Sequence, residues 1–505
     1  MSDEKLFTRR QVLRLSGAAA AGIALGSLPR WGRSAAASAP ALPIPTLIDA
    51  HPGEPVSLAM QNSRHRFGPG AAVAARGISS SYLGPVVRVR SGDTIPFRVE
   101  NRLDEETTLH WHGMLVPSQV DGGPHNTIEP GAVWTPEISV KQAPATNWFH
   151  PHPHGHTGRQ VYLGAAGMMI VSDGADRDRG LPVTYGVDDL PIVLQDKRFG
   201  RNGELVYRPT MMDVMRGFEG DTLLVNGAIG PVANVPAGFV RLRLLNAANA
   251  RNFDLRFSDR RPFFVIAGDS GFLAEPVEVR NLVIAPAERY EVLVNFSDGQ
   301  PVELVTALES HHGSGRGMMM QPGRPRDSAS GAQVFMRFKP DSKLKAMITR
   351  LPRELSRIAP PDIKSAVEWR TFVLEPMLGM HMAMRGASEP RAAVAHQMMG
   401  INGRSFAMDR VDVTVKQGTA EIWEVVSAMM AHPFHLHGAS FRILSNNGKK
   451  PTAEQSGWKD VVLVEERAEI LVRFDHAASP KMPFMYHCHI LEHEDHGLMG
   501  QFAVV

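Results

Sequence analysis

Four His-x-His pairs constrain this chain more than any other feature of its 505 residues. The pairs are His110/His112, His150/His152, His435/His437 and His487/His489. Side chains two positions apart on a β-strand point to the same side, so each pair can direct both imidazoles toward one point. Two pairs lie early and two lie late. We therefore expect eight imidazoles to meet at an interface between the first and last domains.

The rest of the sequence is typical of many short strands. Its 46 glycines and 37 prolines interrupt long helices, and segments such as 86–90, 240–244 and 290–294 nearly alternate between apolar and polar residues, as half-buried strands do. Loosely similar strand–turn–strand segments occur around Gly92, Gly220 and Gly418. Because a chain of this length holds about three domains at ~150 residues each, we predict an all-β fold built from three Greek-key β-sandwiches.

We place the domain boundaries near residues 180 and 345, which gives domains at 40–180, 181–345 and 346–505. Residues 341–366 are predicted to form a linker with some helix, and residues 310–330 a flexible loop. The formal net charge is +2, so no strong field draws the protein toward nucleic acid or a membrane surface.

Residues 1–39 are predicted to be an export signal. A twin-arginine pattern, Thr8-Arg9-Arg10-Gln11-Val12-Leu13-Arg14, precedes an apolar run to Leu28 and small residues that allow cleavage after Ala37 or Ala39. The apolar run is too short for an ordinary membrane span, and no later segment is long and apolar enough. We expect the twin-arginine export machinery as a partner and a soluble, monomeric protein in the periplasm. An unprocessed basic amphipathic terminus is the alternative.

Cys488 is the only cysteine of the chain, so no intramolecular disulfide can form. It lies between His487 and His489, and on a strand its side chain must point to the opposite face. There it can meet His432 and His493, and a thiolate with two imidazoles is the trigonal ligand set of a blue copper electron-transfer site. An electron accepted there can pass through the sulfur and a few backbone bonds into either flanking histidine.

Zinc is the main alternative metal, because histidine and cysteine also bind it. Structural zinc takes four ligands in one tetrahedron, and catalytic zinc usually takes three from the protein. Eleven candidate ligands around a single thiolate match neither pattern.

The sequence around these ligands resembles the multicopper oxidase family, and several stretches are most similar to bacterial periplasmic cuprous oxidases. The matching stretches are LHWHG with VDGGP, WFHPHPHGHTGRQ, HPFHLHGASFRIL, GWKD and HCHILEHEDHG. The resemblance covers essentially the whole chain after the signal. It implies three cupredoxin-like domains and four copper ions: one type 1, one type 2 and a binuclear type 3 pair.

By motif position, the resemblance assigns a role to each ligand. It implies that type 2 copper is bound by His110 and His435, and type 1 copper by His432, Cys488 and His493. The ligands it implies for the type 3 pair are His112, His150, His152, His437, His487 and His489. Reduction of one dioxygen consumes four protons, and Asp121 and Glu494 match the family's proton-relaying acids. The simpler alternatives are a turn-forming aspartate and a solvated glutamate.

The chain departs from the cuprous oxidases at the axial position of type 1 copper. Ten residues after Cys488 the family has a methionine, whereas this chain has Leu498, with Met499 one place later. A shift of one residue turns a side chain to the other face. We therefore expect Leu498 to cover the copper, as in high-potential fungal laccases. A local bulge that brings Met499 to the metal is the alternative.

The methionine-rich insert of the family is also shorter here, at about residues 377–399. It keeps Met377, Met380, Met382, Met384, His396, Met398 and Met399. Thioethers suit Cu(I), but methionines also pack well over a sheet, and both interpretations stay open. At the family's substrate-copper positions stand Leu374, Gly379 and Ala428, and only Met430 agrees, which argues against a tight cuprous site.

The predicted function is oxidation of a reductant by single electrons, coupled to four-electron reduction of O₂ to water. The reductant is Cu(I) or a small phenolic or aromatic compound, and we predict a role in periplasmic copper tolerance. The alternative is oxidation of aromatic compounds like that of laccases or bilirubin oxidases, with no role in copper detoxification. The superfamily also includes non-enzymatic periplasmic division proteins that keep the fold and have lost copper. All eleven ligands are present here, which argues against that class.

Overall fold

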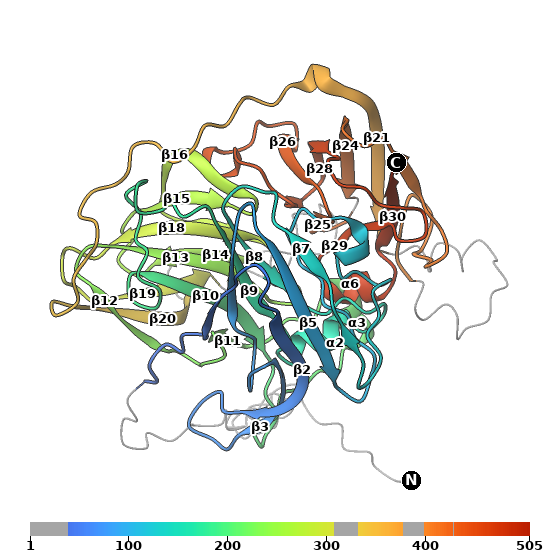
Figure 1. Ribbon diagram of the computed structural model, residues 1–505. Helices are drawn as coiled ribbons and strands as arrows, with labels where there is room; N and C mark the ends of the chain where they lie inside the picture. Colours follow the sequence, from blue (N-terminus) through green and yellow to red (C-terminus); the bar gives the residue numbers. More distant parts are fainter. Residues whose placement is uncertain (1–38, 308–331, 377–397, 428) are drawn as a thin grey trace, which may run out of the picture. The chain divides into compact units, whose positions relative to one another are not determined.

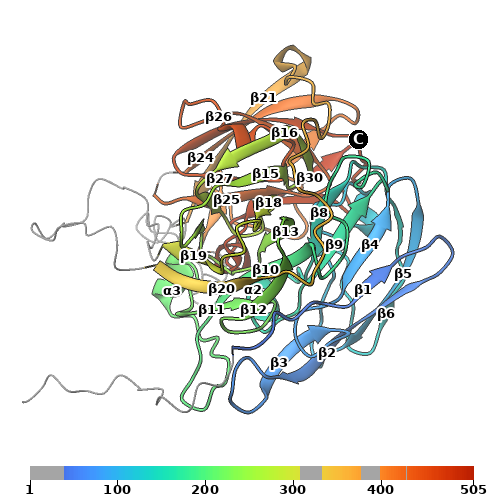
Figure 2. The same ribbon diagram turned by 90° about the vertical axis from the view of Figure 1, so that its left-hand side faces the viewer.

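A computed structural model describes residues 39–307, 332–376, 398–427 and 429–505. The predicted export signal, the predicted loop at 310–330, most of the methionine-rich insert, Gly379 and Ala428 lie outside the described residues. Residues from Pro40 to Val505 form one compact unit. Its sheets combine in pairs into three β-sandwiches, which confirms the predicted all-β fold (Figures 1 and 2).

The first sandwich lies within residues 47–172. One sheet has the order β1 (Leu47–Asp49), β4 (Val86–Arg90), β9 (Gly167–Ser172) and β8 (Ala145–Phe149). The other has the order β3 (Val73–Ile78), β2 (Val56–His65), β5 (Thr94–Arg102) and β6 (Val133–Trp134), with β7 (Glu137–Ser139) also paired to β5. Val89 of β4 and Phe97 of β5 belong to one buried cluster, so the two sheets share a core.

The second sandwich lies within residues 189–341. Its six-stranded sheet has the order β11 (Thr222–Val225), β10 (Asp189–Lys197), β13 (Phe239–Asn246), β18 (Arg289–Asn295), β15 (Phe263–Gly268) and β16 (Gly271–Val279). The facing sheet has the order β12 (Val232–Pro236), β20 (Ala332–Asp341), β19 (Val302–Ala307), β14 (Phe253–Phe257) and β17 (Leu282–Ile284). Leu242 and Phe338 are members of the core between the two sheets.

The third sandwich lies within residues 366–504. One sheet has the order β22 (Gly400–Ile401), β21 (Ala366–Glu375), β24 (Ala420–Ser427), β28 (Arg467–Arg473) and β26 (Ser440–Asn446). The other has the order β23 (Val413–Val415), β30 (Met499–Val504), β29 (Phe484–Cys488), β25 (His432–Leu436) and β27 (Val461–Val464). The predicted boundaries near 180 and 345 fall in the connections between the three ranges, and the division into domains stays a prediction.

Helical segments in the described residues are short. They are α2 (Thr157–Tyr162), α3 (Met211–Arg216), α6 (Leu491–Asp495) and the 3₁₀ turns η1 (Ser118–Val120), η2 (Ile363–Ser365) and η3 (Ala453–Gln455). Both α2 and α3 pack against α6, which directly follows β29 (Figure 1). No described helix has the length and apolar character needed to cross a membrane.

Strand β13 corrects one expectation from the alternating pattern. Its sequence FVRLRLLN predicts one exposed face, yet all eight residues are buried. Arg241 and Arg243 both bond to the buried carboxylate of Glu291, and Arg243 also donates to the Thr146 hydroxyl of the first sandwich (2.9 Å). The polar face of this strand therefore lies at an interface between sandwiches, where ion pairs compensate the burial of its charges.

Candidate metal centre

One pair of neighbouring strands positions both groups of candidate ligands. Strands β25 and β29 are antiparallel, with Phe434 opposite Cys488 and His435 opposite His487. Because alternate residues point to opposite faces, His432 shares a face with Cys488, whereas the histidines at 435, 437, 487 and 489 belong to the other face. The placement predicted from the sequence is thus present in the register of the two strands.

On the Cys488 face, three ligand atoms form a small buried triangle. The Cys488 Sγ lies 3.3 Å from His432 Nδ1 and 3.6 Å from His493 Nδ1, and the two nitrogens are 3.3 Å apart. A metal about 2.0–2.3 Å from three trigonal N and S ligands would space them by roughly 3.6 Å. Burial lowers the pKa of His432 to about 3, so its imidazole is in the neutral form that binds metals. The triangle therefore fits a bound metal ion.

The structure also separates the two candidates for the axial position. Leu498 belongs to the same buried cluster as Cys488, whereas Met499 packs with Phe406 and Met485 in a different one. The register of β29 and β30 places Met499 opposite His487 and shows no bulge from Phe484 to that point. Leu498 therefore lies on the Cys488 face, as predicted.

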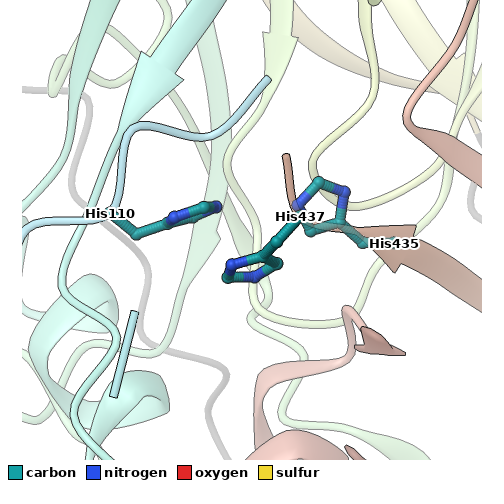
Figure 3. A group of neighbouring side chains, drawn as sticks. All are labelled: His110, His435 and His437. Carbon is teal, nitrogen blue, oxygen red and sulfur yellow. The ribbon is translucent and has the colours of Figure 1, made fainter. Parts of the chain in front are cut away.

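On the opposite face, all eight imidazoles of the four pairs are buried together. The ring of His110 stacks on that of His437 at 3.8 Å between centroids, and His112 stacks on His435 at 3.7 Å. Figure 3 shows His110 approaching His435 and His437 from a separate part of the chain. The early and late pairs therefore meet between the first and third sandwiches.

Three of these imidazoles, those of His152, His437 and His487, direct unprotonated ring nitrogens toward one another. The Nδ1 atom of His437 lies 2.8 Å from an oxygen of Asp121, that of His152 lies 3.2 Å from Glu494 Oε1, and that of His487 donates to a backbone carbonyl. Asp121 and the backbone carbonyl place the proton of His437 and of His487 on Nδ1, and the nearby Glu494 carboxylate favours the same tautomer of His152. The Nε2 lone pairs then converge, with His487 Nε2 3.3 Å from His152 and 3.2 Å from His437. A bound cation between these nitrogens would satisfy all three lone pairs.

A second group of three is arranged in the same way with one difference. His150 donates from Nδ1 to the carbonyl of the next residue (2.8 Å), and His112 directs Nε2 at Asp460 Oδ1 (3.3 Å). The bare atoms are therefore His150 Nε2 and His112 Nδ1, which are 3.4 Å apart. The ring of His489 lies 5.1 Å from that of His112. This group too is suited to a cation.

The last two imidazoles, His110 and His435, each direct Nδ1 to a backbone carbonyl, of Asp121 at 3.0 Å and of Asp460 at 2.8 Å. Their Nε2 atoms are buried and have no hydrogen-bond partner among the described residues. A buried polar atom without a partner is costly, and metal ligation would satisfy both. The whole set of eight thus fits the copper ions that the family resemblance implies.

The two predicted acids contact histidines of this set. The oxygens of Glu494 lie 3.2 Å from Nδ1 of His152 and 3.2 Å from Nδ1 of His487. Burial alone would raise the pKa of Glu494, but these imidazoles hold it well below its usual range. Asp121 follows η1 and is 2 % exposed, with its carboxylate against His437 and, at 3.3 Å, His110. Glu494 is equally buried, so it is not a solvated surface glutamate.

Sequence reasoning missed a third acid, Asp460. It bonds through its side chain to His112 and through its carbonyl to His435, and it forms an ion pair with Arg289. The only signal was its position in the GWKD stretch, one of those that resemble the family. Nothing in the local sequence marks Arg289.

Other residues singled out from the sequence lie outside the histidine cluster. The ring of His154, in the WFHPHPHGHTGRQ stretch, packs beside that of Phe406 with 4.9 Å between the ring centroids. Leu374 and Met399 are buried, and Met430 packs against the core of the third sandwich.

Three multicopper oxidase family models match the chain, at residues 45–176, 203–306 and 376–505. The chain therefore belongs to the multicopper oxidase family, as its motifs predict, and its three sandwiches are the cupredoxin-like domains of that family. Members of the family bind copper, and the histidine clusters described above are where this chain offers ligands.

Individual relatives differ in what their names say. Cell division protein FtsP of Yersinia pestis is 37% identical over 501 residues, which cover 99% of this chain and 98% of that protein. A solved structure of a laccase-like multi-copper oxidase, CueO, from the lignin-degrading bacterium Ochrobactrum sp. is 47% identical, with a TM-score of 0.82 over 92% of this chain and 100% of that one. It is described as having oxidase activity towards lignin model compounds and lignosulfonate. A laccase from Pediococcus acidilactici is 32% identical, with a TM-score of 0.76 over 93% and 94% of the two chains.

Proposed function

We propose that this protein is an O₂-reducing multicopper oxidase with four copper ions. Type 1 copper would be held by His432, Cys488 and His493, type 2 copper by His110 and His435, and the type 3 pair by His112, His150, His152, His437, His487 and His489. When bound, these coppers would supply one-electron acceptance from a reductant and four-electron reduction of O₂ to water. The observation that supports this most strongly is the convergence of bare imidazole nitrogens in two groups of the cluster.

The protein's own residues would connect and insulate the two sites. Cys488 is joined through the backbone to His487 and His489, whose imidazoles belong to the opposite face, so covalent bonds link the thiolate to the histidine cluster. Leu498 would cover the thiolate site without offering a donor atom, which raises the reduction potential of such a site.

Glu494 and Asp121 would handle the protons that O₂ reduction consumes. Each is buried and contacts two candidate ligands. A carboxylate in that position can accept a proton from one side and release it toward the cluster, and it also orients the imidazoles it touches.

The name of the FtsP relatives suggests a different role, in cell division. The oxidase is favoured because a copper-free protein would have no use for lone pairs that face one another in a buried cluster. The deciding experiment is copper loading followed by measurement of copper per chain, blue absorption and O₂ uptake. We expect about four copper ions and rapid uptake with a suitable reductant. A chain that binds no copper and consumes no O₂ would contradict the oxidase.

For the reductant, we propose a small phenolic or aromatic compound. A high-potential type 1 site, as Leu498 favours, suits such substrates, and the Ochrobactrum enzyme is described as acting on lignin model compounds. Cu(I) is the second candidate, because Met215, Met398 and Met430 pack against the cluster that contains Cys488, and thioethers suit Cu(I). Steady-state O₂ uptake with a substituted phenol and with Cu(I), with and without added Cu(II), distinguishes the two.

We also propose a monomeric enzyme exported to the periplasm by the twin-arginine machinery, with domains at 40–180, 181–345 and 346–505. The support is the signal pattern in the first 39 residues. Mass spectrometry of the periplasmic protein should give an N-terminus after Ala37 or Ala39, and replacement of Arg9 and Arg10 by lysine should leave the protein in the cytoplasm.

A further inference from the structure

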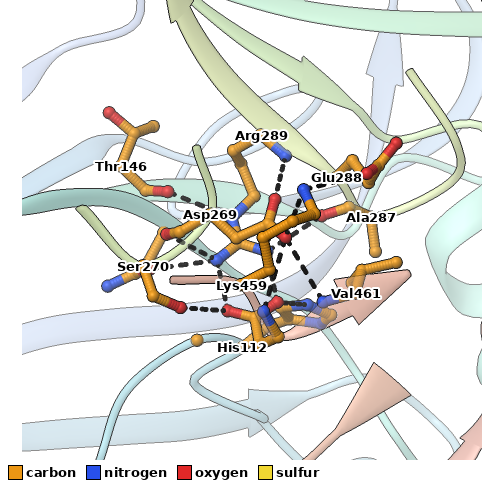
Figure 4. A network of polar contacts seen from close by, with 12 residues as sticks. His112, Thr146, Asp269, Ser270, Ala287, Glu288, Arg289, Lys459 and Val461 are labelled. Atoms are coloured by element: carbon orange, nitrogen blue, oxygen red, sulfur yellow. Dashed lines mark hydrogen bonds and ion pairs between the residues drawn. The ribbon is translucent and has the colours of Figure 1, made fainter. Parts of the chain in front are cut away.

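A buried group of charged side chains lies where the three sandwiches meet, directly beside His112 (Figure 4). Asp460 is 1 % exposed, and Arg289 and Asp269 are fully buried. The two terminal nitrogens of Arg289 donate to the two oxygens of Asp460, each at 2.6 Å. This is the two-bond arginine–carboxylate arrangement that fixes both groups in orientation.

Arg289 belongs to β18 of the second sandwich, yet it bonds to the other two. Its Nε donates to the carbonyl of Thr146 (3.0 Å) and its Nη2 to the side chain of Asn147 (3.2 Å), both on β8 of the first sandwich. Asp460 belongs to the third sandwich and immediately precedes β27. One arginine side chain therefore joins all three sandwiches.

Asp460, held in this way, touches one histidine from each of the two sandwiches that supply the cluster. Its Oδ1 faces His112 Nε2 at 3.3 Å, and its carbonyl accepts from His435 Nδ1 at 2.8 Å. A carboxylate at Nε2 keeps the proton there and leaves Nδ1 of His112 bare. His150, across from it, presents Nε2 instead. His112 presents Nδ1 where His150 presents Nε2, because Asp460 occupies the Nε2 side of the His112 ring.

The backbone beside His112 is shaped to admit the arginine. Gly113 has φ +88°, and a Cβ at this position would lie 2.5 Å from Arg289 Nη2 and 2.9 Å from Asp460 Oδ2. Only glycine leaves room for both the backbone conformation and the guanidinium. The glycine of the LHWHG motif therefore accommodates this contact.

The same contacts could serve interface stability alone. Buried ion pairs, however, contribute little net stability compared with apolar packing of the same volume. Apolar packing would not provide an acceptor for His112 Nε2. The arrangement is thus explained better by what it does to the histidine than by what it adds to the interface.

We propose that Asp460 and Arg289 are positioning residues that hold His112 in the Nε2–H tautomer, so that Nδ1 faces the metal pair. The inference rests on the proposed copper centre. It gives the second sandwich, which supplies none of the eleven candidate ligands, a part in loading that centre: Arg289 orients the acid, and the acid orients the ligand.

The test compares Asp460→Leu with Asp460→Asn, which keeps one acceptor oxygen, and with the matched control Glu288→Gln. Glu288 lies in the same network and contacts Lys459 (2.9 Å) rather than Asp460. Copper affinity is measured by competition with a chelator, together with blue absorption, the electron paramagnetic resonance of the bound copper and the unfolding temperature.

We expect Asp460→Leu to weaken copper binding at the histidine cluster about 10–100-fold, as loss of such supporting groups typically does. Part of the copper should become visible by paramagnetic resonance because its pair is incomplete, while the blue band keeps its wild-type intensity. Asp460→Asn should recover part of the affinity. Glu288→Gln should lower the unfolding temperature without changing copper affinity.

Arg289→Lys provides a second route if Asp460→Leu does not fold. It keeps the positive charge but cannot make the paired bonds, and we expect the same loss of cluster copper with the blue band intact. Wild-type copper affinity in Asp460→Leu, or in Arg289→Lys, would overturn the inference. A wild-type protein without copper or blue colour would instead contradict the proposed function itself.

Discussion

The two faces of the β25–β29 strand pair surround their ligands in different ways. On the Cys488 face, the three candidate ligands all come from the third sandwich, and Cys488 shares an apolar cluster with Leu498 and Phe434. On the other face, eight imidazoles from two sandwiches are supported by three acids, Asp121, Glu494 and Asp460. An electron acceptor needs a rigid, water-free surrounding, whereas a site that consumes protons also needs groups that deliver them. The difference fits the proposed function, in which the Cys488 face accepts electrons and the other face reduces O₂.

The largest effect should follow from removing the thiolate. We expect Cys488→Ser to abolish the blue absorption, which arises from thiolate-to-copper charge transfer, and to abolish oxidation of every reductant. The histidine cluster is untouched, so copper content should fall by only about one ion in four. Absorption spectroscopy with metal analysis checks both, and a blue Cys488→Ser protein would refute the assignment of this face.

The acids of the other face should matter for O₂ and not for the reductant. Glu494→Gln and Asp121→Asn keep the shape of each side chain and remove the titrating group. We expect reoxidation by O₂ to slow by about 10²–10⁴, the typical range for proton relays, while reduction of type 1 copper stays near the wild-type rate. Stopped-flow measurement of the two half-reactions separates them. Reoxidation at wild-type speed in both variants would exclude the relay.

The division between the faces was largely predictable from the sequence. The period of two along a strand places Cys488 opposite His487 and His489 without any knowledge of the fold. Four pairs, two early and two late, required distant parts of the chain to meet. The same period also placed Leu498 and Met499 on different faces, and the register of β29 and β30 agrees.

The sequence did not reveal the side-chain contacts that join one sandwich to another. Arg289 and Asp460 are 171 positions apart, and no local pattern links them. Likewise, the alternation of β13 indicates a polar face but not that Glu291 and Thr146 would cover its arginines. Periodicity specifies which side of a strand a residue occupies, whereas the partner on that side depends on how the domains dock.

Copper removal should also distinguish the faces, through stability. Occupied sites at about a thousand times their dissociation constant each add about 4.1 kcal/mol to the free energy of unfolding. The histidine cluster holds two sandwiches together, so we expect chelation to lower the denaturant midpoint clearly in both the wild type and Cys488→Ser. Unchanged stability after stripping Cys488→Ser would show that the cluster does not bind metal across the interface.

The smallest and most specific effect should come from replacing Leu498, which lies on the Cys488 face. Leu498→Met should add an axial thioether, stabilise Cu(II) and lower the reduction potential of the blue site, where about 59 mV corresponds to a tenfold change in the equilibrium constant of a one-electron step. Oxidation of high-potential phenols should slow accordingly. Met499→Leu is the matched control, because Met499 packs with Phe406 and Met485 on the other side of the strand. It should leave the potential unchanged. Redox titration of the blue band in both variants decides between the two residues: a potential raised by Met499→Leu and unmoved by Leu498→Met would mean that Met499 reaches the copper after all.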